Sequence, residues 1–97
     1  EKAEYVNLIL DDMNIQEISE EDQQFLQGFS ETQFLSLNST QLKTICRLPT
    51  LQKLDRLELN DNRIGSSDNL LDSLATLYLN LRVLKLSNNQ IKTIEEI

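Results

Sequence analysis

The sequence predicts an α/β fold built from repeated coils, each adding one strand to a parallel sheet. Residues 54–64 and 81–91 both follow the pattern L-x-x-L-x-L-x-x-N-x-I, which is typical of leucine-rich repeats. The apolar positions recur earlier in the chain, so four repeats start near residues 5, 32, 54 and 81, with spacings of 27, 22 and 27. We therefore expect one domain over residues 1–97. It is a leucine-rich repeat solenoid, a right-handed β-α superhelix with its sheet on the concave face and helices or 3₁₀ turns on the convex face.

Alternation along each strand separates core positions from a partner-facing surface. Leu57 and Leu59 are predicted to point into the core, whereas Arg56 and Glu58 point to the concave face. Repeat proteins usually hold their partners on that face. The predicted partner-binding residues are Asp11, Asp12, Phe34, Ser36, Asn38, Arg56, Glu58, Asn60, Asp61, Lys85 and Ser87. For Phe34 the alternative is packing against a cap or loop.

The asparagine at the ninth repeat position is predicted to be structural. The amides of Asn62 and Asn89 are able to bond backbone groups of the next coil that no longer belong to the sheet. The first two repeats have Met13 and Thr40 at this position. The expected asparagine ladder is therefore limited to the second half of the chain.

The segment that begins at Ser19 is predicted to form a convex helix. Residues 19–22 resemble a capping box, and Phe25, Leu26 and Phe29 follow at helical spacing. The same acidic residues make Ser19 a candidate phosphorylation site, although they favour a helix N-terminus regardless of any kinase.

A second convex helix is expected in the other long repeat, while the short repeat has no room for one. Residues 66–68 are predicted to cap that helix, and its apolar side chains on one face are Leu70, Leu71, Leu74 and Leu77. The 22-residue repeat contains Pro49, the single proline, where a full helix would be interrupted. A turn or a short 3₁₀ segment is expected there.

Charge indicates a basic protein partner and argues against nucleic acid. The formal net charge is −7, and the first 48 residues carry nine acidic but only three basic side chains. Affinity for nucleic acid depends on clustered cations, which this sequence lacks. No apolar run approaches the roughly 20 residues that span a bilayer, so no membrane partner is expected.

No catalytic, metal or cofactor site is predicted. The chain has no histidine, and its single cysteine, Cys46, is expected to be a small buried hydrophobe in a reducing compartment. The acid pairs Asp11 with Asp12 and Glu58 with Asp61 are candidates for a divalent cation, but a solvated acidic surface is favoured. We expect a non-enzymatic protein.

Two segments identify a family resemblance. Residues 48–64 closely resemble the L-P-x-L-x-K-L-x-x-L-E-L-S-D-N-R-V segment of the acidic leucine-rich nuclear phosphoprotein 32 family. Residues 84–92 resemble that family's L-N-L-S-G-N-K-I-K, and the alternation of long and short repeats is similar across residues 5–97. Ser66 and Ser67 depart from it, since the family usually has glycines there.

The resemblance implies a histone-binding chromatin regulator of nucleus and cytoplasm that restrains histone acetylation and inhibits protein phosphatase 2A. Asp11, Asp12, Glu58 and Asp61 would then contact Lys or Arg of the partner. The family's later repeats, C-terminal cap and acidic tail are absent from residues 1–97, so we expect a self-associating fragment. The alternative is a generic leucine-rich scaffold, such as a spliceosomal A-prime-like protein or a phosphatase or dynein regulatory subunit.

Overall fold

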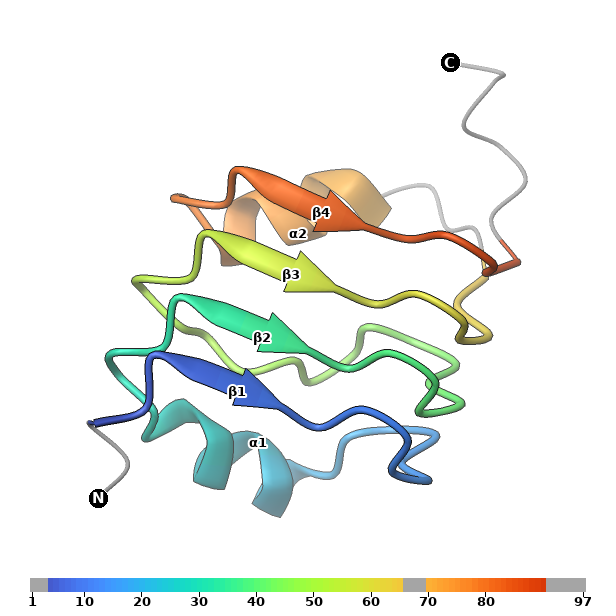
Figure 1. Ribbon diagram of the computed structural model, residues 1–97, viewed down its shortest axis with the longest axis horizontal. Coiled ribbons are helices and arrows are strands. Elements are labelled where there is room, and N and C mark those ends of the chain that lie inside the picture. The colour runs from blue at the N-terminus through green and yellow to red at the C-terminus, as the bar shows by residue number, and fades with distance from the viewer. Residues whose placement is uncertain (1–3, 66–69, 91–97) are drawn as a thin grey trace.

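Four parallel strands lie side by side in chain order in the computed structural model, which describes residues 4–65 and 70–90 (Figure 1). The elements are β1 (Asn7–Ile9), α1 (Glu20–Gln27), β2 (Phe34–Ser36), β3 (Arg56–Glu58), α2 (Leu70–Leu77) and β4 (Val83–Lys85). The sheet order is β1-β2-β3-β4. The predicted parallel α/β architecture is therefore confirmed.

The strand register follows the leucine spacing. Leu8 pairs with Leu35, Leu35 with Leu57, and Leu57 with Leu84. These partners are 27, 22 and 27 residues apart, as the repeat pattern predicted. Because side chains alternate between the two sides of a strand, in-register pairing stacks all four leucines on one side of the sheet.

The core lies between the sheet and the helices. Leu35 and Leu57 are fully buried, and they belong to one core cluster with Leu26 of α1 and Leu74 of α2. Figure 1 shows α2 behind β3 and β4, with α1 below β1. Burying each leucine removes apolar area worth roughly 2 kcal/mol from water, which makes this layer the main source of stability.

The short repeat crosses behind the sheet in turns. No helix or 3₁₀ segment lies between β2 and β3, so the turn alternative is correct. Leu48 and Leu51 are buried there, and Pro49 is buried between them. The Tyr78 hydroxyl, just after α2, donates a 2.6 Å hydrogen bond to the Pro49 carbonyl. Burial also raises the pKa of Tyr78, so this hydroxyl keeps its proton and remains a donor.

Both helices form where the apolar spacing placed them. Ser19 is the N-cap of α1, and its Oγ accepts a 3.1 Å hydrogen bond from the Asp22 amide. In α2, Leu70 and Leu74 are buried, but Leu71 is 43% exposed. The expectation that Leu71 shares the buried face is wrong, because one residue turns a helix by about 100° and carries the next side chain off the apolar stripe. The predicted cap at 66–68 lies outside the described residues.

Asn62 is a buried structural residue, as predicted. Its amide oxygen accepts hydrogen bonds from the backbone amides of Thr40 and Leu42 at 2.9 and 3.0 Å. Its amide nitrogen donates to the Leu37 carbonyl at 2.8 Å. These groups belong to the preceding coil, so the expectation of bonds to the next coil is wrong. The side chain points back into the turn of the coil before it.

Asn89 repeats the arrangement one coil later. Its amide oxygen accepts from the Ile64 amide at 3.0 Å, and its amide nitrogen donates to the Leu59 carbonyl at 2.8 Å. Met13, at the same repeat position in the first coil, is 52% exposed. The asparagine ladder is therefore confined to the third and fourth coils, as predicted.

Cys46 is exposed, so its predicted role as a buried hydrophobe is wrong. The reason is a tight turn in which Arg47 has a positive φ of 67°. That turn directs Leu48 into the core and half-buries Ile45, while Cys46 faces outward. Alternation of apolar residues does not predict this, because the turn interrupts the alternation.

The β1 edge of the sheet carries exposed apolar side chains. Tyr5, Val6 and Met13 are all more than two-fifths exposed, and Ile9 is 58% exposed. An exposed strand edge with apolar neighbours favours association with another chain. The self-association expected from the sequence, on the ground of absent C-terminal repeats, stays a prediction.

Replacing Asn62 by alanine should lower the free energy of unfolding by about 3 kcal/mol, because buried backbone groups in the preceding coil lose their partners. Urea denaturation measures the loss. The control is Asn14→Ala, which removes an amide bonded only to the exposed Gln16 side chain and should cost less than about 0.5 kcal/mol. Equal losses in the two variants would contradict the structural role of Asn62.

Candidate functional site

The side of the sheet opposite the core, which we call the open face, carries three rows of residues. The first and second rows are set by the strand register, and the third lies two residues beyond each strand. In order from the first coil to the fourth, the rows are Asn7, Phe34, Arg56 and Val83; Ile9, Ser36, Glu58 and Lys85; and Asp11, Asn38, Asn60 and Ser87. The structure thus brings most of the predicted partner-binding residues onto one face.

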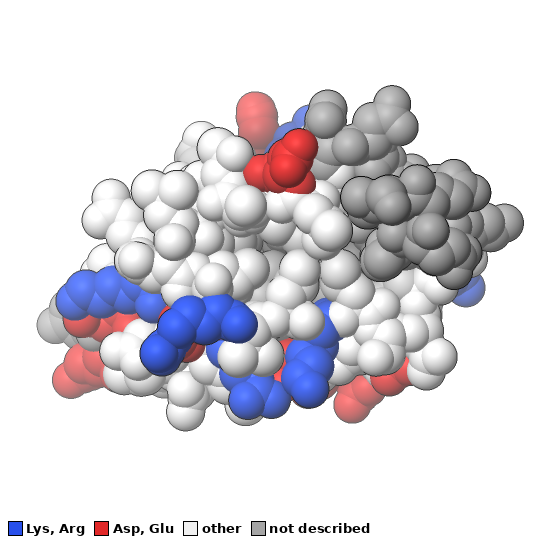
Figure 2. Space-filling view, turned by 90° about the horizontal axis from the view of Figure 1, so that it is seen from above, with Lys and Arg blue, Asp and Glu red and all other residues white. Residues whose placement is uncertain are grey.

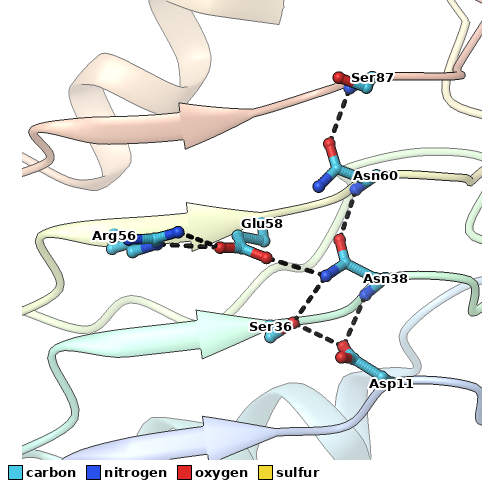
Figure 3. A network of polar contacts seen from close by, with 7 residues as sticks. All are labelled: Asp11, Ser36, Asn38, Arg56, Glu58, Asn60 and Ser87. Carbon is cyan, nitrogen blue, oxygen red and sulfur yellow. Dashed lines mark hydrogen bonds and ion pairs between the residues drawn. The ribbon is translucent and has the colours of Figure 1, made fainter.

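The third row forms a hydrogen-bonded ladder between coils (Figure 3). Asp11 Oδ1 accepts from the Asn38 amide at 2.9 Å, and Asn38 Oδ1 accepts from the Asn60 amide at 2.7 Å. Asn60 Oδ1 accepts from the Ser87 amide at 2.8 Å. We call this row the polar ladder. Its side chains bond the backbone of the coil that follows, so they hold the coils in register.

The polar ladder is a second structural device that sequence analysis missed. Their outward positions alone predict partner binding. Their spacings of 27, 22 and 27, identical to the leucine spacings, were the available signal. A short polar side chain at the same position in every coil is what a repeated backbone bond requires.

Ser36 is buried, at only 2% exposure, so the expectation that it lies open to a partner is wrong. Its Oγ donates a 2.6 Å hydrogen bond to Asp11 Oδ1 and accepts one of 3.0 Å from Asn38 Nδ2. The larger side chains of Asp11 and Asn38 cover it. Ser36 therefore links Asp11 and Asn38 of the polar ladder through its hydroxyl group.

Glu58 is held by donors from two neighbouring coils. Asn38 Nδ2 donates to its Oε1 at 2.9 Å, and Arg56 donates to its Oε2 through Nε at 2.9 Å and Nη2 at 2.6 Å (Figure 3). The Asn38 hydrogen bond, followed by the Arg56 bonds, lowers the pKa of Glu58, and the charge of nearby Lys85 adds to this. Glu58 is therefore a carboxylate committed to internal partners.

Phe34 contacts a cation from the neighbouring strand. The Arg56 guanidinium carbon lies 5.3 Å from the centre of the Phe34 ring, which is a cation–π geometry. The ring is half-buried. Arg56 thus joins the aromatic ring in the first row to the carboxylate in the second.

Asp12 and Asp61 are the carboxylates of the predicted site that remain exposed. They share one repeat position with Ser39 and Asn88, and all four have positive φ values of 57–66°. Asp and Asn tolerate this conformation better than most residues, so the turn favours them. Asp61 Oδ1 accepts a 2.7 Å bond from Asn88 Nδ2. The acidic part of the open face is therefore its border at these turns.

Basic side chains also lie on the open face. Figure 2, seen from above at the β4 end, shows Lys and Arg gathered along one side, with acidic side chains among them. Lys85 is exposed, and Arg82 pairs with Asp55 at 3.0 Å. The open face is thus mixed in charge rather than uniformly acidic.

Comparison with known proteins supplies a relative. No family model matches the chain. The acidic leucine-rich nuclear phosphoprotein 32-related protein of Plasmodium falciparum (isolate 3D7) is 32% identical over 89 residues, which is 92% of this chain. The chain is related to the acidic leucine-rich nuclear phosphoprotein 32 family. It spans 31% of the length of that relative.

Within residues 4–65 and 70–90, no three His, Cys, Asp or Glu side chains are placed to hold a metal ion. Asp11 of the first candidate acid pair is bonded within the polar ladder, and Glu58 of the second is bonded to Arg56. Over the same described ranges, no helix is both long and apolar enough to cross a membrane.

Ser19 lies away from the open face, at the start of α1. It lines a hollow of about 290 Å³ together with Glu17, Ile18, Glu20 and Arg47. The capping role is confirmed by the bond from the Asp22 amide. Phosphorylation of Ser19 stays a prediction, and Arg47 in the same hollow is a cation that a phosphate would face.

Acidification should lower the free energy of unfolding, because the stabilising contribution of the Glu58 carboxylate is lost. Its folded-state pKa is lowered, so its contribution is present above the ordinary carboxyl pKa and is lost as pH falls through the folded value. Glu58→Gln keeps an acceptor for Asn38 but removes the titration. Urea unfolding between about pH 6 and about pH 3 should show a smaller loss in this variant than in the wild type.

The matched control for that pH series is Glu17→Gln, which changes an exposed carboxyl in a turn. It should lose stability on acidification as the wild type does. A pH dependence in Glu58→Gln that equals the wild-type dependence would refute the role of this carboxylate.

The two roles of Ser19 are separable. Ser19→Ala should lower the free energy of unfolding by about 1 kcal/mol, whereas Ser19→Asp, which also caps helices, should keep it nearly unchanged. Ser73→Ala, on the exposed side of α2, is the control. Phosphopeptide mapping of protein from its native source checks the modification, and an unmodified Ser19 would remove the regulatory role while leaving the cap.

Proposed function

We propose that this chain is a non-enzymatic interaction module that binds basic proteins such as histones at the acidic border of its open face. The observation that carries the proposal is the exposure of Asp12 and Asp61, while Asp11 and Glu58 are bonded internally. Exposed carboxylates attract Lys and Arg, and the bond that Asp61 accepts from Asn88 lies at the surface, where a cation can join it. Of the four acids that the sequence predicts as contacts, Asp12 and Asp61 are therefore the primary ones.

The spacing of these two residues suits an extended basic segment. Asp12 and Asp61 belong to the first and third coils, and neighbouring strands lie about 4.8 Å apart. Their backbones are therefore separated by about 10 Å across the sheet, close to three residues of extended chain at about 3.3 Å each. Because side chains of an extended chain alternate between two sides, cations two or four positions apart, about 7 or 13 Å, face one side and bracket this separation.

The biological role we propose follows the family relationship. The name of the relative describes an acidic leucine-rich nuclear phosphoprotein, which supports a nuclear protein built as a leucine-rich repeat solenoid. We extend this to chromatin regulation in nucleus and cytoplasm, with restraint of histone acetylation by covering lysine-rich segments, and to inhibition of protein phosphatase 2A. The chain spans 31% of the relative, so the remaining length would supply further contacts.

The alternative is a scaffold whose partners are not chosen by positive charge, such as a spliceosomal A-prime-like protein or a phosphatase or dynein regulatory subunit. The mixed character of the open face supports it. Ile9 is exposed on β1, and Lys85 is exposed on β4. A partner that buries such residues would bind with little dependence on salt.

A charge-matched pair of variants separates these functions. Asp12→Asn with Asp61→Asn keeps residues that accept a positive φ and removes two charges from the border. Glu21→Gln with Asp72→Asn removes two charges from the helices instead. We expect the first variant to bind core histones about tenfold more weakly than the wild type, with a smaller salt dependence, and the second to bind nearly as well.

Calorimetric titration of histones over a series of salt concentrations measures both effects. Equal weakening in the two variants would indicate that only net charge matters and would remove the assigned contacts. Wild-type binding that is absent, or indifferent to salt, would favour the scaffold function.

A further inference from the structure

We propose that Phe34, Asn38 and Glu58 form a receptor site for an arginine side chain of a partner, and that Arg56 occupies this site in the unbound chain. The inference deepens the proposed function, on which it rests, by naming one side chain that the open face takes. Phe34 and Glu58 lie in the first and second rows, on β2 and β3, and Asn38 lies in the third row, two residues beyond β2.

The floor and wall of the site are fixed without help from Arg56. The Phe34 ring is half-buried, and the Glu58 side chain is only 15% exposed. Asn38 holds the carboxylate through a 2.9 Å bond and is itself held by the Asn60 amide in the polar ladder. An aromatic face and an oriented carboxylate would therefore remain in place if the guanidinium left.

Arg56 makes the contacts that a bound ligand would make. Its guanidinium carbon lies 5.3 Å from the ring centre, and Nε and Nη2 both donate to Glu58 Oε2 (Figure 3). Its side chain is 45% exposed, three times the exposure of Glu58. The cation is thus the outermost part of the cluster, and a change of side-chain rotamer releases it without moving the sheet.

Exchange with another arginine conserves the interactions of the cluster. Glu58 has little solvent exposure, so an empty site would leave its carboxylate poorly compensated. An incoming guanidinium offers the same paired donors and the same flat face for the ring, whereas lysine offers a point charge without that fork.

The test opens the site and adds a free ligand. Arg56→Ala removes the internal occupant, and N-acetyl-arginine methylamide is the probe, with the neutral citrulline analogue as its matched control. We expect NMR titration of Arg56→Ala to show binding of the arginine probe on the order of tenfold tighter than in the wild type. The Phe34 ring and Glu58 side-chain signals should shift, and the citrulline analogue should produce no such change.

Four further variants make the result specific. Arg82→Ala removes a cation from a pair with Asp55, outside the site, and should gain nothing. Adding Phe34→Leu or Glu58→Gln to Arg56→Ala should abolish the gain. Arg56→Gln, measured in parallel, retains a polar side chain over the ring and should gain in the same direction if the alanine variant does not fold.

The outcomes separate the site from the proposed function. No gain in either Arg56 variant, or an equal gain in Arg82→Ala, overturns the receptor site even if histones bind. Arginine capture by Arg56→Ala supports the site even if wild-type protein fails to bind histones, in which case the proposed function is wrong.

Discussion

The structure depends on the pairing of backbone groups outside its sheet. Each strand has only three residues, so most of every coil lies beyond the strand hydrogen bonds. Buried backbone amides and carbonyls must be paired, and side chains provide the partners at two repeat positions. Asn62 bonds the coil before it inside the core, and the polar ladder bonds the coil after it on the open face.

This requirement limits which polar residues are free for recognition. Asp11 and Asn38 sit on the open face, yet their acceptor atoms serve the neighbouring coil. Glu58 is committed in the same way to Asn38 and Arg56. A net charge of −7 therefore overstates the acidity that a partner meets on this face, because part of it is already paired within the protein.

Sequence periodicity was sufficient to predict the strands, their register and the Ser19 cap, because each depends on spacing along the chain. It did not predict the burial of Ser36, which results from Asp11 and Asn38 closing over it. That relation runs across coils, and alternation along one strand does not encode it. Cys46 was mispredicted because a turn with a positive φ at Arg47 reverses the side to which it points.

The two ends of the open face differ in the sign of their exposed charges. Asp12 lies in the first coil at the border, whereas Lys85 is exposed on β4. Between them, Arg56 and Glu58 neutralise each other at the centre. Under the proposed function, the exposed acids of the first and third coils would attract a basic segment and Lys85 would repel it near β4, so electrostatics would favour one placement on the face. The internal bonds that hold the coils together thus also decide where charge remains to direct a partner.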